Sequence, residues 1–192
     1  MTTSVCVFLG SHGAPSYEDA ARRLGTTIAE RGHRLVYGGA SVGLMGVLAD
    51  AALAAGGEVV GVIPHGLFDI EVAHAGVTEL HETPTMHDRK RLMYDLSDVF
   101  VAFPGGIGTL DETFEAMTWS ALGIFAKPLG FLDVDDFWQP LLSFLRGAVD
   151  RGVMSEKRRP LFDLVDTEPA ALLDRLLSAV APAEGVISPS ER

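Results

Sequence analysis

Short apolar runs alternate with longer amphipathic stretches along this chain. Apolar runs of about four to eight residues, bounded by glycine, proline or polar residues, are typical of buried strands. They predict strands at residues 4–9, 35–37, 58–63, 77–80, 98–103, 128–132 and 161–165. Apolar residues at helical spacing predict helices at 16–31, 42–55, 86–96, from after Glu112 to near Gly123, 138–151 and 169–180. The alternation predicts an α/β fold, a Rossmann-like doubly wound parallel sheet with helices on both faces.

No linker or internal repeat divides the chain. Its 192 residues suit a single domain, which we expect to span residues 1–180. Residues 181–192 contain two prolines and a glycine, and we expect this tail to be disordered. Two predicted helices have candidate caps at their starts: Ser16, with Asp19 three residues later, and Thr167.

A glycine-rich segment follows the predicted strand 98–103. Residues 104–112 read PGGIGTLDE and precede a helical pattern. Such a turn exposes backbone N–H groups, and the helix N-terminus adds a partial positive charge. We therefore expect residues 105–109 to bind a phosphate. Glu112 places a carboxylate within one helical turn of that site, which indicates chemistry on a phosphorylated ligand.

Two further glycine turns follow predicted strands, after Leu9 and after Tyr37. The carboxyl ends of parallel strands meet at one edge of a sheet, and ligands bind outside that edge. We therefore expect the three glycine turns to contribute to one shared site.

Composition and charge exclude several classes of protein. The net charge of −11 argues against nucleic acid as a partner, because nonspecific binding needs a basic face. No apolar stretch approaches the roughly 20 residues that span a bilayer, and the N-terminus has no signal-peptide pattern. The single cysteine, Cys6, fits a reducing compartment, so we expect a cytoplasmic protein that does not bind membranes. The six histidines have no zinc-site spacing, so we expect no metal or cofactor.

The familiar phosphate-binding motifs fit poorly. Gly38 and Gly43 have the glycine spacing of a P-loop, but Leu44 stands where that motif has lysine. Gly106 and Gly108 begin a dinucleotide fingerprint, but Asp111 stands where its third glycine belongs, and a carboxylate would repel a pyrophosphate. These spacings disfavour an ATPase and an NAD-binding protein.

Several ordered motifs instead resemble one known family over roughly residues 5–153. The matching segments are 7–11 (VFLGS), 37–46 (YGGASVGLMG), 61–64 (GVIP), 86–90 (MHDRK) and 104–112, then Thr118-Trp119, Leu122-Gly123 and Lys127-Pro128. They resemble the LOG-type phosphoribohydrolases, which are named for the plant Lonely Guy protein and are often labelled lysine decarboxylases. Two features depart from the family pattern: the loop 11–17 is shorter than in many relatives, and Ala121 stands where the family often has glutamine.

The resemblance implies an enzyme that hydrolyses the N-ribosidic bond of purine riboside 5′-monophosphates. The products are free base and ribose 5-phosphate, and the substrates are cytokinin nucleotides or AMP. It also implies a homodimer with sites at the subunit interface. It implies Arg89 and Glu112 as the catalytic residues. The substrate-binding residues implied with them are Gly10, Ser11, Gly39, Met86, Lys90, Gly105, Gly106, Ile107, Gly108 and Thr109.

Elementary chemistry assigns roles to the two catalytic candidates. Cleavage of an N-ribosidic bond builds positive charge on the sugar, which the Glu112 carboxylate would stabilise; Glu112 could also activate the attacking water. Arginine stays protonated and is a poor proton donor, so Arg89 would orient Glu112 or bind ribose and phosphate. The acid for the departing base stays open, with Asp88, water or no acid as the alternatives.

Three other interpretations compete with this one. Thr109 and Glu112 also form a capping-box pattern, which is commonly structural. A nucleotide-binding carrier without turnover would use the glycine turn but would not need Arg89 and Glu112 together. Lysine decarboxylation is disfavoured, because none of the three lysines has a recognisable pyridoxal phosphate setting.

Overall fold

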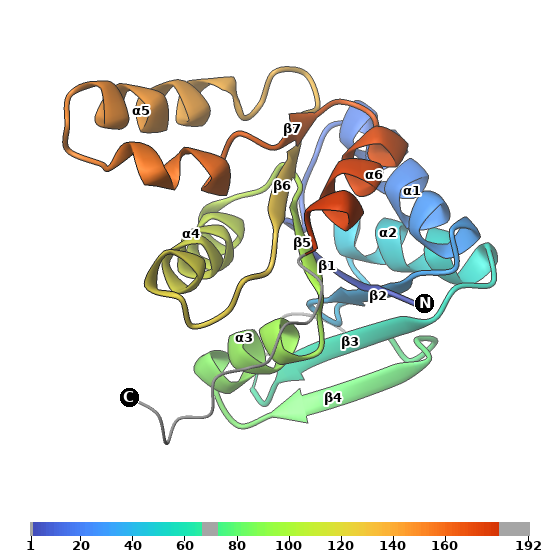
Figure 1. The fold of residues 1–192 in the computed structure, drawn as a ribbon. Helices are drawn as coiled ribbons and strands as arrows, with labels where there is room; N and C mark the ends of the chain where they lie inside the picture. Colours follow the sequence, from blue (N-terminus) through green and yellow to red (C-terminus); the bar gives the residue numbers. More distant parts are fainter. Residues whose placement is uncertain (1, 67–72, 181–192) are drawn as a thin grey trace.

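The computed structural model describes residues 2–66 and 73–180, which form a parallel sheet of seven strands covered by helices (Figure 1). The strand order is β4-β3-β2-β1-β5-β6-β7, and every pairing is parallel. The strands are β1 (Ser4–Phe8), β2 (Arg34–Tyr37), β3 (Val59–Pro64), β4 (Glu79–Thr83), β5 (Val99–Ala102), β6 (Leu129–Leu132) and β7 (Val165–Asp166). The α/β class predicted from the sequence is confirmed.

The described residues also form six α-helices and one 3₁₀ helix, which all lie between strands except the last α-helix, which follows β7. They are α1 (Pro15–Glu30), α2 (Gly43–Ala54), α3 (Met86–Asp95), α4 (Ile107–Leu122), α5 (Gln139–Asp150), η1 (Glu156–Leu161) and α6 (Pro169–Ala179). The predicted tail 181–192 lies outside the described residues, as do residues 67–72.

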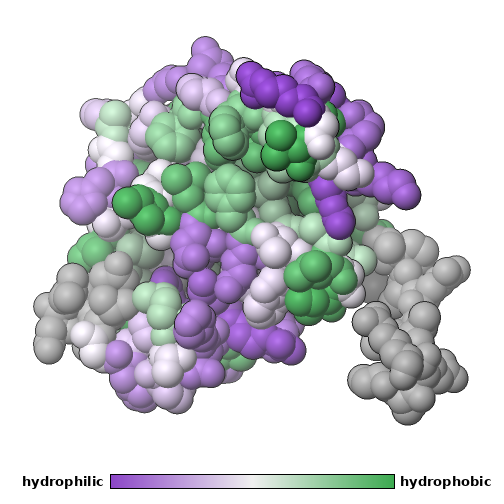
Figure 2. All heavy atoms as spheres, turned by 90° about the vertical axis from the view of Figure 1, so that its left-hand side faces the viewer, coloured by the Kyte–Doolittle hydropathy of each residue, from purple (hydrophilic) through white to green (hydrophobic). Residues whose placement is uncertain are grey.

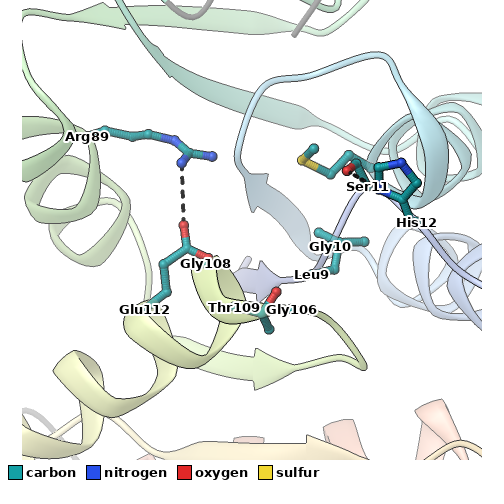
Figure 3. Close-up of a pocket in the computed structure, with 10 residues that line it drawn as sticks. Leu9, Gly10, Ser11, His12, Arg89, Gly106, Gly108, Thr109 and Glu112 are labelled. Atoms are coloured by element: carbon teal, nitrogen blue, oxygen red, sulfur yellow. Dashed lines mark hydrogen bonds and ion pairs between the residues drawn. The ribbon is translucent and has the colours of Figure 1, made fainter. Parts of the chain in front are cut away.

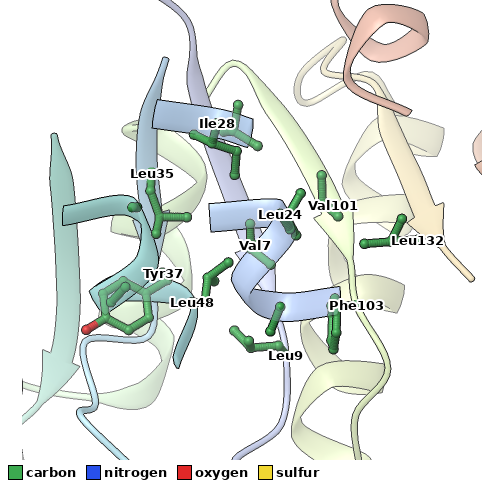
Figure 4. Close-up of a cluster of buried hydrophobic side chains, with 14 of the residues drawn as sticks. Val7, Leu9, Leu24, Ile28, Leu35, Tyr37, Leu48, Val101, Phe103 and Leu132 are labelled. Carbon is green, nitrogen blue, oxygen red and sulfur yellow. The ribbon is translucent and has the colours of Figure 1, made fainter. Parts of the chain in front are cut away.

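Two hydrophobic clusters lie on opposite faces of the sheet. Successive side chains of a strand point to opposite faces, and β1 shows this directly: Val5 and Val7 join one cluster, whereas Cys6 and Phe8 join the other. Buried residues of α1, α2 and α6 complete the first cluster (Figure 4), and those of α3, α4 and α5 complete the second. Both faces are therefore covered, as a fully parallel sheet requires.

The strand order reverses between β1 and β5. From β1 the chain continues to β2, β3 and β4 on one side, and then returns to place β5 on the other side of β1. The loops after β1 and β5 diverge at such a switch point and leave a crevice at the carboxyl edge. Both loops begin one of the glycine turns predicted from the sequence.

The predicted start of α4 and both predicted helix caps are wrong. Helix α4 begins at Ile107, inside the glycine segment, rather than after Glu112. Helix α1 begins at Pro15, since proline fits the first turn of a helix, and the hydroxyl of Ser16 donates to Asp135 instead of capping. The N-cap of α6 is Glu168, not Thr167, and again proline occupies the first helical position.

Two predicted strands also differ. The strand expected at 161–165 is reduced to β7, because Leu161 ends the 3₁₀ helix and Phe162 is buried in the second cluster. The strand expected at 77–80 lies at Glu79–Thr83. This strand is at the edge of the sheet and only Thr83 in it is buried, so it lacks the apolar run by which interior strands are recognised.

Candidate functional site

A cavity of about 330 Å³ opens at the carboxyl edge of the sheet, where the loops after β1 and β5 diverge (Figure 3). It is lined by Leu9, Gly10, Ser11, His12, Met45, Arg89, Gly106, Gly108, Thr109 and Glu112. Seven of these ten residues were expected from the sequence: Arg89, Glu112, Gly10, Ser11, Gly106, Gly108 and Thr109. Residues from the first and third glycine turns therefore meet in one cavity.

The glycine turn forms the start of α4. Gly106 is the N-cap and makes no side-chain capping bond, and the first helical hydrogen bond runs from the amide of Leu110 to the carbonyl of Gly106. The amides of the first turn of an α-helix have no acceptor within the helix. The structure thus presents amide donors and the positive end of a helix dipole at the cavity.

Close packing explains why residue 105 is glycine. A Cβ atom added at Gly105 would lie 2.7 Å from the backbone nitrogen of Gly10 and would collide with the hydroxyl of Thr109. The turns after β1 and β5 are therefore in direct backbone contact, which a larger residue would force apart.

The capping-box interpretation of Thr109 and Glu112 is wrong. Both residues lie inside α4, and the N-cap is Gly106. The hydroxyl of Thr109 is buried, with 3% of the residue exposed, and has no hydrogen-bond partner among the described residues. A buried polar group without a partner costs about 1–3 kcal/mol, so this hydroxyl marks a position where a polar ligand would be stabilised.

Arg89 and Glu112 face each other across one side of the cavity (Figure 3). Arg89 Nη1 lies 3.6 Å from Glu112 Oε1, and each side chain is 10% exposed. The guanidinium also donates from Nε to the carbonyl of Val62 at 3.0 Å and from Nη2 to the carbonyl of Gly38 at 3.3 Å. The planar fork is thereby fixed in orientation, and it holds a buried carboxylate next to the first turn of α4.

The second glycine turn holds Arg89 rather than lining the cavity. The carbonyl of Gly38 accepts from Arg89, and the carbonyl of Gly39 accepts from the backbone nitrogen of His74 at 2.9 Å. Gly39 adopts a positive φ of 80°, a conformation that favours glycine. Gly39 was expected to contact substrate, but it does not line the cavity.

His74 is a supporting residue that the sequence did not single out. Its Nδ1 accepts from the backbone nitrogen of Gly76 at 3.1 Å, so the proton lies on Nε2, which is 3.0 Å from Asp50 Oδ1. The buried imidazole thus ties the segment after residue 73 to α2. Through its backbone bond to Gly39, this segment steadies the turn that orients Arg89.

Lys90 lies outside the cavity. Its ammonium group is 2.9 Å from Asp111 Oδ2 and 3.1 Å from Glu115 Oε2. Burial by itself lowers the pKa of Lys90, but the hydrogen bonds and charges of these two carboxylates outweigh it and raise the pKa above its ordinary value. Lys90 therefore stays charged and joins α3 to α4.

The remaining candidates lie at the margins of the cavity. Gly105 packs behind the turn against Gly10, and Ile107 points outwards with 86% of its surface exposed. The sulfur of Met86 accepts from Arg89 Nη1 at 3.4 Å. Asp88, considered as a general acid, accepts a hydrogen bond from the Thr85 hydroxyl and does not line the cavity.

Three lining residues were not predicted: Leu9, His12 and Met45. Leu9 and His12 flank the turn after β1. Their position beside a predicted glycine turn could have identified them as lining residues. Met45 offers no such signal, because a methionine at helical spacing normally belongs to the core.

The described part of the chain contains neither a candidate metal-binding cluster nor a helix able to span a membrane. Within residues 2–66 and 73–180, no three His, Cys, Asp or Glu side chains gather as they would around a metal ion. No helix there combines the length and the apolar character needed to cross a membrane.

A helix N-terminus at the switch point of a parallel sheet is how many α/β proteins bind phosphorylated ligands. The fold and the site therefore place this protein among the α/β proteins that have a cavity at a helix N-terminus, at the switch point of a parallel sheet. Among solved structures, the chain resembles a molybdenum cofactor binding protein from Rippkaea orientalis, with a TM-score of 0.71 and 23% identity over 94% of this chain and 99% of that chain. At that identity the likeness confirms the fold alone.

Sequence comparisons identify the family. The family model described as "Possible lysine decarboxylase" matches residues 45–176. A cytokinin riboside 5′-monophosphate phosphoribohydrolase of Rhodococcoides fascians is 48% identical over 81% of this chain and 80% of the relative. The enzyme of that name designated LOG7 in Arabidopsis thaliana is 43% identical over 93% of this chain and 82% of the relative. The chain belongs to this LOG family of phosphoribohydrolases.

Proposed function

We propose that this protein hydrolyses the N-ribosidic bond of purine riboside 5′-monophosphates, cytokinin nucleotides or AMP, releasing free base and ribose 5-phosphate. The observation that carries the proposal is the buried Arg89–Glu112 pair, which lies in the same cavity as the first turn of α4. The names of the relatives support the same reaction.

The glycine turn would position the substrate through its phosphate. Amides of the first turn of α4 would bind the phosphate oxygens, and the hydroxyl of Thr109, which has no hydrogen-bond partner among the described residues, would donate to one of them. Glu112 lies one helical turn further on, so a ribose attached to that phosphate would extend towards its carboxylate. Holding the sugar against a catalytic group in this way lowers the entropic part of the barrier.

Glu112 would stabilise the positive charge that develops on the ribose. A unit charge about 4 Å away gains roughly 1 kcal/mol in water and roughly 4 kcal/mol at an effective dielectric constant of 20. The low exposure of Glu112 therefore increases its effect, and the gain is specific to the charged transition state. The same carboxylate can accept the proton of the attacking water.

Arg89 would act on Glu112 and on the substrate but would not donate a proton. Its guanidinium stays protonated at any physiological pH, and its three contacts fix the fork in place. It would keep Glu112 ionised and offer its remaining N–H groups to the ribose or the phosphate.

A nucleotide panel tests this function. Wild-type protein is incubated with AMP, N6-isopentenyl-AMP and the corresponding ribosides, and free base and ribose 5-phosphate are quantified by chromatography. We expect release from the prenylated monophosphate and, within the wider purine scope of the proposal, from AMP. Stoichiometric binding without release would support a nucleotide carrier instead, and release of carbon dioxide from lysine would support a decarboxylase.

We also propose that the protein is a homodimer with α4 at the interface. Ile107, Leu122 and Ile124 are 86%, 68% and 55% exposed, and all three lie on or directly after α4. The side of the molecule on which α4 lies shows apolar residues gathered among hydrophilic ones (Figure 2). Exposed apolar surface of this kind marks interaction sites. Ile107 lies between two glycines that line the cavity, so a second subunit there would border the site.

A further inference from the structure

The charged groups of the cavity do not balance the proposed ligand. A phosphate monoester carries about −1.5 to −2 charges at pH 7. Among the ten lining residues, Arg89 and Glu112 are the ionised side chains, and their charges cancel. The amides of the glycine turn carry only partial charge. His12 is the one remaining lining residue whose side chain can become cationic.

His12 is held in place by its neighbour in the turn after β1. Its Nδ1 lies 2.9 Å from the hydroxyl oxygen of Ser11. When the Ser11 hydroxyl donates to Nδ1, the ring proton lies on Nε2; when the ring is protonated, both nitrogens carry protons. In both states Nε2 carries a proton. It can donate that proton to a ligand, because the bond to Ser11 uses Nδ1.

The position of His12 distinguishes two roles. Arg89 and Glu112 lie on one side of the cavity, Ser11 and His12 lie on the opposite side, and Gly10, Gly106 and Thr109 lie between them (Figure 3). A substrate with its anomeric carbon at Glu112 and its phosphate at the glycine turn would reach His12 with the phosphate end. The leaving base would be at the other end of the ribose.

We propose that His12 binds the 5′-phosphate as a cation that donates from Nε2, and that it does not serve as the acid for the leaving base. The inference rests on the proposed function, because it adds to that site a residue that binds the phosphate of the substrate. His12 thereby contributes to the preference for monophosphates over ribosides.

Two substitutions at residue 12 test this role. His12→Gln replaces the ring with a polar side chain that cannot become cationic, whereas His12→Arg supplies a permanent cation. A charge-assisted hydrogen bond to phosphate corresponds to roughly a ten- to hundredfold change in affinity. We expect His12→Gln to raise KM for the monophosphate and Ki for ribose 5-phosphate by about that factor. kcat should change little, and His12→Arg should recover most of the loss. His33→Gln, before β2 at the opposite edge of the sheet, serves as the matched control.

Ribosides separate phosphate binding from proton donation. A riboside has no phosphate, so His12→Gln should leave its hydrolysis or its competitive inhibition unchanged. An equal loss of kcat for riboside and monophosphate, with KM unchanged, would overturn the proposal and make His12 the acid. An unchanged Ki for ribose 5-phosphate would also overturn it.

Direct titration keeps this test independent of turnover. Calorimetry with ribose 5-phosphate and with inorganic phosphate compares wild type with His12→Gln whether or not base is released. Wild-type protein that binds ribose 5-phosphate more tightly than the variant, yet releases no base from any nucleotide, would refute the proposed function and support the role of His12. Equal affinities would refute the role of His12 alone.

Discussion

Glu112 and Asp111 are neighbours in the sequence but lie in different surroundings. Glu112 is buried in the cavity opposite Arg89, whereas Asp111 is mostly exposed and pairs with Lys90. Since α4 already begins at Ile107, its helical twist turns the two carboxylates to different sides. The pair therefore offers a matched test of whether position or charge alone determines activity.

Glu112→Gln should lower turnover of the monophosphate by roughly 10²- to 10⁴-fold, the usual effect of losing an acid–base group. Asp111→Asn, which removes the same charge one residue away, should keep turnover close to that of wild type. Steady-state base release and a thermal melt of each variant provide the measurement. Equal turnover in Glu112→Gln and wild type would exclude Glu112 as the catalytic group.

Arg89 has both a structural and a chemical role. Arg89→Ala leaves the carbonyls of Val62 and Gly38 without their guanidinium donor, which should cost about 1–3 kcal/mol of unfolding free energy per buried group. Arg89→Lys keeps the charge but cannot reach all three partners, so it should fold more stably than Arg89→Ala and still turn over slowly. Chemical denaturation and base release are measured on both. Normal turnover in Arg89→Lys would show that charge alone suffices.

At the scale of elements, the glycine turn is defined by backbone contact. Gly105 has no room for a side chain, whereas a Cβ atom added at Gly108 meets nothing within 4 Å. Gly105→Ala should therefore lower the melting temperature and abolish turnover. Gly108→Ala should fold as stably as wild type, because alanine favours the helix, but it should raise KM, since its methyl group enters the ligand cavity. Melts and kinetics of both variants check this, and equal melting temperatures would contradict the packing argument.

Residues 74–76 support Arg89 indirectly, because the His74 backbone nitrogen donates to the carbonyl of Gly39, in the turn that holds Arg89. His74→Ala removes the buried ring that joins Gly76 to Asp50, and we expect it to reduce kcat and to lower the unfolding free energy by about 1–3 kcal/mol. His65→Ala removes an exposed histidine whose ring pairs with Glu82, and surface pairs of this kind contribute about 0–1 kcal/mol. Denaturant titration distinguishes them. An unaffected His74→Ala would show that the turn at Gly39 does not depend on this ring.

The sequence predicted the elements better than their ends. Interior strands such as β1 and β5 are continuous apolar runs and were found at nearly the correct residues. The start of α4 was missed because two glycines, which have low helix propensity, flank its first residue, Ile107. The hydrogen bond from the Leu110 amide to the Gly106 carbonyl shows that the turn is already helical. Met45 and His74 were missed for a different reason: their roles arise from contacts between segments distant in sequence.

At the scale of the whole molecule, the exposed apolar residues of α4 predict assembly. Leu122→Glu places a charge on this surface, far enough along the helix to leave the glycine turn intact. It should convert the proposed dimer into a monomer and lower turnover, because the second subunit would no longer border the cavity. Phe144→Glu, at an exposed position on α5, is the matched control. Light scattering of both variants provides the measurement, and a wild-type monomer would refute the dimer.

The lone hydroxyl of Thr109 has a consequence for the free energy of the empty protein. This hydroxyl is desolvated and has no hydrogen-bond partner among the described residues, so the ligand-free protein should be less stable than the same chain with an oxyanion at the helix start. Ligand binding should therefore stabilise the fold: the melting temperature should rise with ribose 5-phosphate concentration, because the ligand binds the native state. Thr109→Val, which replaces the hydroxyl by a methyl group of similar shape, should melt higher when vacant and gain less from the ligand.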